Sequence, residues 1–232
     1  MSLKEDISTE IGQILTETWI EENTNIVPEA EKIRLNNHAK NLDKATVLYA
    51  DLDGSTNMVD KYTWQFSAEI YKAYLRAAAR VIRSMNGEIT AYDGDRIMAI
   101  FVGDAKNTDA VKVAMKINWV VHNIINPKIA ATYDNNDFKL DHKIGIDMSQ
   151  LRAARIGVRG YNDLVWIGRA ANYAAKLTEC KQETIWITKA VYDVIHAEAK
   201  YVSNSKENMW TQYSWTSMNN IAIYGSSYTW SL

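Results

Sequence analysis

The chain has 232 residues, of which 47% are hydrophobic and 23% charged, so it is long enough to bury the core of one large domain. A formal net charge of −2 without a basic tract argues against nucleic acid as a partner, and the one cysteine, Cys180, excludes an internal disulfide framework and a thiolate metal cage. No apolar run approaches a membrane span and the charged N-terminus does not resemble a signal peptide, so we expect a soluble cytoplasmic protein that does not bind membranes.

The first 43 residues are expected to form an extension outside the main domain. An amphipathic helix over residues 5–20 is predicted by hydrophobic residues spaced by four, namely Ile7, Ile11, Leu15 and Trp19. Residues 21–43 are polar and contain Pro28, so irregular structure is expected there. We therefore divide the chain into an extension, residues 1–43, and one domain, residues 44–232.

Strands and helices are mixed along the rest of the chain, which predicts a single α+β domain. The predicted strands are residues 45–51, 87–93, 95–102, 141–148, 151–158, 184–188, 210–216 and 220–230. The predicted helices are residues 62–84, 107–125, which Pro127 should end, 168–179 and 189–199. Loops are expected at residues 132–137 and 160–163. The core-facing stripe of the first of these helices is predicted to be Ala68, Tyr71, Leu75, Ala78 and Ile82.

The segment Val47-Leu-Tyr-Ala-Asp-Leu-Asp-Gly-Ser-Thr56 places a carboxylate, Asp51, at the end of an apolar strand. A tight turn at Gly54 follows, and Ser55 or Thr56 is expected to cap the next helix. Free backbone N–H groups at a helix N-terminus bind phosphate, and a nearby carboxylate can hold a divalent cation against it. The segment therefore favours a metal–phosphate site, although Asp-Gly-Ser is also a common turn.

A second carboxylate follows in a predicted hairpin. The Asp-Gly-Asp tip at residues 93–95 joins two strands, with Gly94 expected at positive φ. In a compact sheet, Asp95 at this tip would reach Asp51 on the neighbouring strand. Two such carboxylates suit a pair of metal ions that activate a hydroxyl and stabilise phosphoryl charge.

An Ala-rich helix near residue 170 carries the third candidate group. Asn172 and Lys176 are four residues apart and share one helical face. On this evidence alone, such polar groups are more often solvated than catalytic.

Together these stretches resemble the class III nucleotidyl cyclase catalytic domain over roughly residues 44–190. Lys143-Ile-Gly-Ile-Asp147 and Arg155-Ile-Gly157 are similar to the strand pair that the family carries there. The resemblance implies a ferredoxin-like βαββαβ core with a mostly antiparallel sheet flanked by helices. It also implies two Mn²⁺ or Mg²⁺ ions bound by Asp51, Asp95 and the backbone carbonyl of Leu52.

Other family roles carry over residue by residue. The Gly-x-x-x-Asn-x-Ala-x-Arg pattern falls on Gly168, Asn172, Ala174 and Lys176, with lysine in place of the transition-state arginine. If Lys176 is only a surface residue, the nearby cations that could replace it are Arg96, Arg152, Arg155 and Arg169. The resemblance further implies a homodimer in which one chain supplies both aspartates and the other supplies Asn172 and Lys176. Phosphates would be held by the backbone of Asp53, Gly54, Ser55 and Thr56, with Arg96 nearby.

The base-reading positions depart from the purine cyclases. Family members place a polar residue where this chain has Ala91, and another where it has Val165. A usual phenylalanine is Tyr49, which should narrow the pocket and offer a hydrogen bond. Because a purine edge without partners would lose about 1–3 kcal/mol per unpaired group, a smaller base is favoured.

This combination resembles the pyrimidine cyclases of bacterial anti-phage signalling, the Pycsar systems. The resemblance implies conversion of UTP to 3′,5′-cyclic UMP and pyrophosphate, with the product activating a separate effector. Cytidylate cyclisation, a purine cyclase with an altered base pocket and a catalytically silent nucleotide-binding module remain alternatives. An interaction protein is a further alternative, because the C-terminal region is rich in aromatic residues that could pack in the core, form a dimer seam or stack on a base: Trp210, Tyr213, Trp215, Tyr224, Tyr228 and Trp230.

Overall fold

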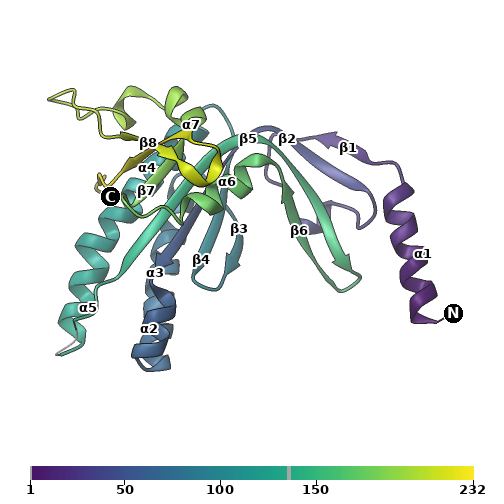
Figure 1. Ribbon diagram of the computed structural model, residues 1–232, viewed down its shortest axis with the longest axis horizontal. Helices are drawn as coiled ribbons and strands as arrows, with labels where there is room; N and C mark the ends of the chain where they lie inside the picture. The colour runs from purple at the N-terminus through teal and green to yellow at the C-terminus, as the bar shows by residue number, and fades with distance from the viewer. Residues whose placement is uncertain (1, 135–136) are drawn as a thin grey trace.

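The computed structural model describes residues 2–134 and 137–232, and within them nine strands form one mixed, mostly antiparallel sheet (Figure 1). Its main path runs β3-β4-β2-β5-β7-β9-β8, while β1 pairs with β2 and β6 pairs with β5. Only the β1–β2 and β5–β7 pairs are parallel. The strands are β1 (Ile20–Asn23), β2 (His38–Asp53), β3 (Glu88–Asp93), β4 (Arg96–Phe101), β5 (Asp141–Val158), β6 (Tyr161–Ile167), β7 (Ile185–Thr188), β8 (Thr211–Trp215) and β9 (Ile221–Ser226).

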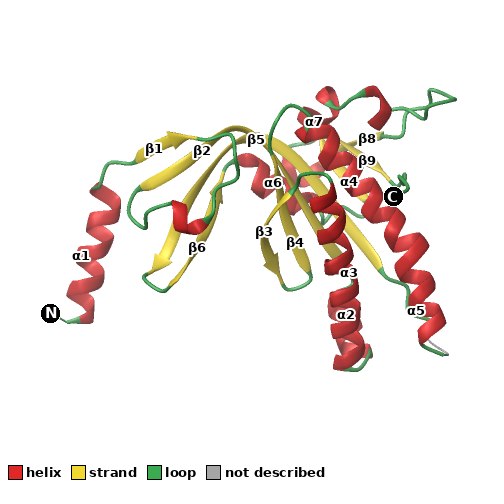
Figure 2. Cartoon of the chain, turned by 180° about the vertical axis from the view of Figure 1, so that it is seen from behind, coloured by secondary structure: helices red, strands yellow, loops and turns green. Residues whose placement is uncertain are grey.

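Helices cover both faces of the sheet (Figure 2). The helices are α1 (Leu3–Thr16), α2 (Ser55–Lys61), α3 (Trp64–Ser84), α4 (Lys106–Val120), α5 (Asn126–Thr132), α6 (Arg169–Leu177) and α7 (Lys189–Val194). A π-helical segment, η2 (Val121–Ile125), joins α4 to α5. Leu48 and Ala50 of β2 pack into the core beneath α3 and α4, whereas Val47 packs with the alanines of α6. Because both faces are covered, the centre of β2 is apolar without interruption, as in a strand buried on both sides.

The two longest strands, β2 and β5, serve two parts of the molecule. Their inner halves lie in the central sheet, and their outer halves continue beyond an irregularity between Leu42 and Ala45. There they form an extension with β1 and β6, which we call the arm (Figure 1). The helix α1 hangs from the far end of the arm, well separated from α3 and α5, and none of its residues is buried.

The N-terminal third differs most from the sequence predictions. The first helix ends at Thr16 rather than near residue 20, and Ile20 begins β1. Residues 21–43 are irregular only in part, because residues 21–23 belong to β1 and residues 38–43 to β2, with which β1 pairs. Between these strands, residues 24–37 hold only the short 3₁₀ turn Ala30–Lys32, as expected of an irregular segment. The expected boundary between residues 43 and 44 thus falls inside β2. A short polar segment such as β1 shows no alternation of hydrophobic residues that would predict a strand. It forms a strand because it pairs with β2.

Four other predictions need correction. The buried residues of α3 are Phe66, Ser67, Ile70, Tyr74, Ala78, Val81 and Ile82. Of the predicted stripe, Ala78 and Ile82 are buried, Tyr71 and Leu75 pack against the same core while partly exposed, and Ala68 is wrong. Pro127 does not end the helical run, because it lies in the first turn of α5, directly after the π-helical segment η2. The predicted strands 141–148 and 151–158 are one strand, β5. The expected turn at residues 160–163 is shorter, since β6 starts at Tyr161.

The remaining predictions hold better. The α+β class with a mostly antiparallel sheet is confirmed, as are the hairpin β3–β4 and the helix α6. Helix 189–199 is instead α7 followed by a short 3₁₀ turn at Ala197–Ala199. The predicted loop 132–137 lies partly outside the described residues. Trp210, Trp215 and Tyr224 are buried, and the Trp210 indole N–H donates to the carbonyl of Ala199 over 2.8 Å, which supports core packing for these three aromatics.

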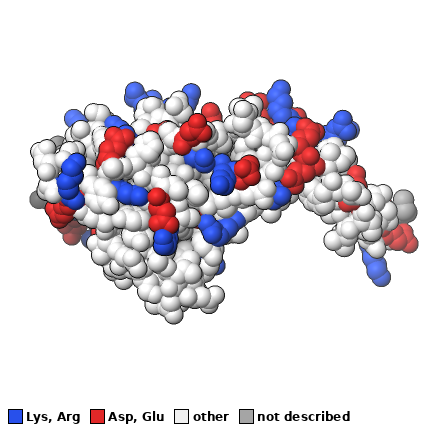
Figure 3. Space-filling model, turned by 90° about the horizontal axis from the view of Figure 1, so that it is seen from above, with Lys and Arg blue, Asp and Glu red and all other residues white. Residues whose placement is uncertain are grey.

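On the face in Figure 3, basic and acidic side chains are interspersed rather than segregated. In the part of the chain that the structure describes, no helix combines the length and apolar character needed to cross a membrane.

A buried histidine gives a stability prediction. His142, 1% exposed, lies between the Tyr74 hydroxyl and the side-chain oxygen of Asn118, and burial lowers its pKa to about 3. Below its unfolded pKa of about 6.5, the unfolded chain binds a proton that the folded chain does not. The free energy of unfolding should therefore fall as pH drops, by about 2 kcal/mol between pH 7 and 5 from this group. Urea unfolding at several pH values measures it.

The matched comparison is His142→Gln against His122→Gln, because the His122 side chain is exposed. We expect His142→Gln to lose stability at pH 7 but to show a shallower decline towards pH 5. An equal slope in both variants would contradict the assignment.

Candidate active site

The two predicted aspartates come together at one end of the neighbouring strands β2 and β4. Asp51 lies opposite Arg96 in the β2–β4 register, and Asp95 precedes Arg96 in the β3–β4 turn. Gly94 in that turn has φ +61°, as predicted. Burial raises the pKa of Asp51 to about 6, and the negative charge of Asp95 adds to this increase while Arg96 opposes it. The sequence-based pairing of these carboxylates is therefore reproduced by the fold.

This pair fits a divalent cation. A half-buried carboxylate beside another carboxylate is short of positive charge, and the nearest described cation, the Nε of Arg96, is 3.9 Å from Asp51 Oδ1. Residues 2–134 and 137–232 contain no group of three or more His, Cys, Asp or Glu side chains suited to a metal. Two carboxylates completed by substrate phosphates and water suit Mg²⁺ or Mn²⁺. Leu52 buries its side chain in the core, so it has only its backbone to offer.

The turn after Asp51 differs in one detail from the prediction. The N-cap of α2 is Gly54 at φ +75°, with no side-chain cap hydrogen bond, so the expectation that Ser55 or Thr56 caps this helix is wrong. The first backbone N–H groups of a helix have no partner within it, and here they belong to Ser55 and Thr56. The carboxylate of Asp53 is 3.5 Å from the Nζ of Lys181. The role of this turn in binding phosphates stays a prediction.

Beside the aspartates lies a cavity of about 200 Å³, lined by Tyr49, Ala91, Asp93, Arg96, Met98 and Ala175. Tyr49 and Ala91 both lie opposite Met98 in the register of their strands, so three neighbouring strands contribute to one wall. Burial raises the pKa of the Tyr49 hydroxyl, which stays protonated near neutral pH. The predicted pocket residues Tyr49, Ala91 and Arg96 are thus brought together.

Val165 is not among the residues that line this cavity. It lies in β6 opposite Ala154, in the arm, so its role in base selection stays a prediction that this chain's own pocket does not support. Met98, Asp93 and Ala175 were missed by the sequence analysis. The cross-strand rule could have found Met98 once Tyr49 was placed on β2, because directly opposed residues share a face.

Asn172 and Lys176 both lie on the exposed side of α6. The Nζ of Lys176 is 3.8 Å from the sulfur of Met218. Among the residues that the structure describes, neither side chain forms a hydrogen bond or ion pair with Asp51 or Asp95. Each chain therefore carries two separate sets of candidate groups, the aspartates on one side and Asn172 with Lys176 on the other.

The other candidate cations are largely occupied elsewhere. Arg152 pairs with Glu21 over 2.7 Å, and Arg155 donates to Asn162 over 2.7 Å, both in the arm. Arg169 pairs with Asp147. Arg96 alone of the four lines the cavity beside Asp51, so it is the best placed alternative to Lys176.

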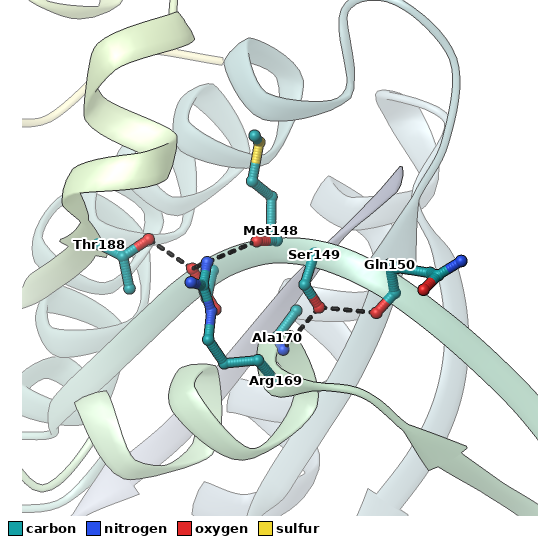
Figure 4. Close-up of polar contacts among 7 residues, drawn as sticks. Met148, Ser149, Gln150, Arg169, Ala170 and Thr188 are labelled. Atoms are coloured by element: carbon teal, nitrogen blue, oxygen red, sulfur yellow. Dashed lines mark hydrogen bonds and ion pairs between the residues drawn. The ribbon is translucent and has the colours of Figure 1, made fainter. Parts of the chain in front are cut away.

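A buried network fixes the start of α6 (Figure 4). Asp147 of β5 is fully buried and accepts hydrogen bonds from Arg169 Nε over 3.0 Å and from the Thr188 hydroxyl. Burial raises the pKa of Asp147, and its bonds to Thr188 and Arg169 oppose this. Ser149 Oγ accepts the backbone N–H of Ala170 over 3.0 Å, which holds the same turn. The charged Asp147 within the apolar stretch of residues 144–148 is the sequence signal that could have found this network.

Comparisons with known proteins identify the fold and the family of the chain. The fold is that of nucleotidyl cyclase catalytic domains. An adenylyl cyclase, CyaB from P. aeruginosa, superposes with a TM-score of 0.65 at 17% identity, covering 81% of this chain and 95% of that one. The guanylyl cyclase Cya2 gives a TM-score of 0.66 at 16% identity, over 82% of this chain and 94% of that one. No protein-family model matches the chain.

Relatives found by sequence are more similar to this chain than these solved structures are. The chain is 51% identical over 233 residues to a uridylate cyclase of Burkholderia cepacia, covering all of both proteins. It is 49% identical to a uridylate cyclase of Xanthomonas perforans over 99% of each chain, and 36% identical to one of Rhodovulum over 98% of this chain and 97% of the relative. The protein belongs to the uridylate cyclases, a family of class III nucleotidyl cyclases. The resemblance drawn from its motifs is confirmed.

The close packing of α6 against β5 can be tested by substituting Gly145. A Cβ built at this position would lie 2.1 Å from the backbone oxygen of Ala174 and 2.7 Å from Leu177 Cβ, so α6 would have to move. We expect Gly145→Ala to lower the free energy of unfolding by about 1–3 kcal/mol, as other overpacked sites do. Gly12→Ala is the control, because nothing lies within 4 Å of a Cβ there and alanine favours the helix. Equal urea midpoints for Gly145→Ala and the unmodified protein would show that α6 is not held this closely.

Proposed function

We propose that this enzyme converts UTP to 3′,5′-cyclic UMP and pyrophosphate. The observation that carries the proposal is the Asp51–Asp95 pair beside a small pocket lined by Tyr49, Ala91 and Met98. At the two positions where purine cyclases carry base-reading polar groups, this chain has Ala91 and Val165, and Tyr49 offers one hydroxyl to a smaller base. Full-length relatives named uridylate cyclases support uracil as that base.

The reaction needs little covalent help from the protein. The ribose 3′-oxygen attacks the α-phosphorus, the bond to the bridging oxygen of the β-phosphate breaks, pyrophosphate leaves, and the hydroxyl proton passes to solvent or a base. Divalent cations held by Asp51, Asp95 and the Leu52 carbonyl would acidify the hydroxyl and offset phosphate charge. The backbone of Asp53, Gly54, Ser55 and Thr56 is proposed to bind the outer phosphates. Tyr49 would hold the base against Met98.

Two copies are proposed to share each site. Asn172 and Lys176 are exposed on α6 and make no described contact with the aspartates of their own chain, which supports their use by a second copy. There, Asn172 would orient the ribose, and Lys176 would oppose charge on the α-phosphate. Lysine lacks the bidentate fork of arginine, so Arg96 of the aspartate-bearing chain is proposed to share the work. Two symmetric copies would then carry two equivalent sites.

The product is proposed to act as a second messenger in anti-phage defence, reaching a separate effector as a diffusible nucleotide. The similarity to the pyrimidine cyclases of such systems supports this role.

The substrate prediction is tested by incubating the protein separately with UTP, CTP, ATP and GTP in the presence of Mn²⁺ and identifying products by mass spectrometry. We expect cyclic UMP and pyrophosphate as the main products. Cyclic CMP would change only the base, whereas cyclic AMP or cyclic GMP would overturn the interpretation of Tyr49 and Ala91. No product from any nucleotide would contradict the proposed activity.

Removal of either aspartate should stop catalysis. We expect Asp51→Asn and Asp95→Asn each to lower kcat/KM for UTP more than about 100-fold, since losing even an outer partner of a metal ligand costs 10–100-fold. Asp60→Asn, on the exposed side of α2, is the matched control and should retain full activity. Circular dichroism checks that all three variants fold. Full activity in either test variant would exclude the assigned metal site.

Sharing of the site is tested by complementation. Asp51→Asn and Lys176→Met, each expected to lose most activity alone, should regain activity when mixed and refolded or exchanged, because a mixed dimer holds one intact site. Random exchange would give about a quarter of the unmodified activity, since half the dimers are mixed and each has one of two sites. Mass spectrometry of intact complexes verifies that mixed dimers form. Inactive mixed dimers would mean that each chain builds its site alone.

A further inference from the structure

Helix α1 presents an apolar face with no cover. Its hydrophobic residues lie on one stripe and are all exposed: Leu3, Ile7, Ile11, Ile14 and Leu15. The exposed fraction of Ile7 is 45% and that of Ile14 is 59%. A capping box at Ser2 and Glu5 supports the start of the helix. A 14-residue helix with no buried side chain is marginal alone, so a partner surface would stabilise it.

A groove of about 900 Å³ lies on the opposite side of the molecule, between α3 and the continuous run of α4, η2 and α5. Its floor is apolar and includes Ile70, Val81, Val120, Ile125 and Ile129. Two small residues, Ala73 and Ala77, line the α3 wall and would let another helix approach closely. Ile124 at its rim is 39% exposed.

The lengths of the helix and the groove agree. At 1.5 Å per residue, α1 is about 20 Å long, and the α3 wall from Glu69 to Ser84 is about 22 Å long. The hydrophobic stripe of α1 would therefore contact the groove along its whole length.

The charges also agree. Four basic residues line the groove, Arg76, Arg80, Lys116 and Lys128, against one carboxylate, Glu69. Glu69 already accepts a hydrogen bond from Tyr133. Within residues 2–134 and 137–232, Arg76, Arg80 and Lys128 form no ion pair. Helix α1 carries three carboxylates, Glu5, Asp6 and Glu10, and one lysine, Lys4.

The spacing of these charges is matched as well. Asp6 and Glu10 are four residues apart and lie along one flank of the hydrophobic stripe of α1. Arg76 and Arg80 are also four residues apart, along the rim of the groove. One packing of the two helices would place both carboxylates against both guanidinium groups.

We propose that α1 of one copy docks in the α3–α5 groove of a second copy. The chain's own α1 cannot do this, because it hangs from the far end of the arm on the other side of the molecule (Figures 1 and 2). A two-fold symmetric pair makes the contact twice, since each copy offers one helix and one groove. The inference rests on the proposed pairing of two copies and assigns that pairing a surface that shares no lining residue with the cavity beside Asp51.

Cross-linking tests the contact directly. Ile11→Cys and Ala77→Cys are made in separate chains that carry Cys180→Ser, then mixed, exchanged and treated with a bifunctional maleimide. We expect a covalent dimer in the mixture and much less with either variant alone. Thr9→Cys, on the opposite face of α1, replaces Ile11→Cys in the control and should give a yield at least fivefold lower. Equal yields from the two mixtures would overturn the proposal, as would efficient cross-linking of Ile11→Cys to itself.

Charge reversal gives a second measurement that does not depend on a reactive cysteine. Asp6→Lys with Glu10→Lys, and Arg76→Glu with Arg80→Glu, should each raise the dimer dissociation constant about tenfold in sedimentation experiments, and mixing the two variants should restore it. No change in either variant would overturn the proposal. Complementation between the Asp51→Asn and Lys176→Met variants tests the shared catalytic site separately. If those variants complement each other while the charge reversals leave the dissociation constant unchanged, the docking of α1 is wrong and the shared catalytic site stands.

Discussion

The burial of β2 on both faces is the constraint on which the rest of the structure depends. Leu48 and Ala50 pack beneath α3 and α4, while Val47 and Tyr49 face α6. Because side chains alternate along a strand, a slip of one residue would exchange these sets and place apolar groups against the wrong layer. The same register therefore sends Asp51 to the face of Tyr49 and opposite Arg96. The strand register that packs the core is therefore the same register that places Asp51 in the candidate site.

A second constraint is the close packing of α6 against β5. Gly145 lets the helix backbone approach the strand, and the buried Asp147 holds Arg169 at the first residue of the helix. An unpaired buried carboxylate would be costly, so the ion pair fixes where the helix starts. Asn172 and Lys176 then point outward at a defined place. A rigidly mounted, outward-facing pair suits a site completed by another copy, as catalytic groups need firm support.

The arm and the groove extend this logic to assembly. Long strands such as β2 and β5 carry β1, β6 and α1 far from the core that stabilises them. An extension of this kind gains little from its own chain, and α1 buries nothing there. The apolar groove beside α3 likewise has no cover among the described residues of its own chain. Two incomplete surfaces of matched length and opposite charge are most simply satisfied by each other in a pair of copies.

Local chemistry in the sequence determined the family, the pair of candidate metal-binding aspartates, the Gly94 turn and the face shared by Asn172 and Lys176. Each of these depends on a few adjacent residues whose types nearly dictate their geometry. Tertiary structure decided what depends on distant partners. The polar β1 is a strand only because β2 accepts it, β5 continues through Ser149 because β2 lies alongside, and the stripe of α3 is set by the layer it meets. Met98 joined the pocket, and Val165 did not, because pairing across strands places side chains that sequence distance alone does not relate.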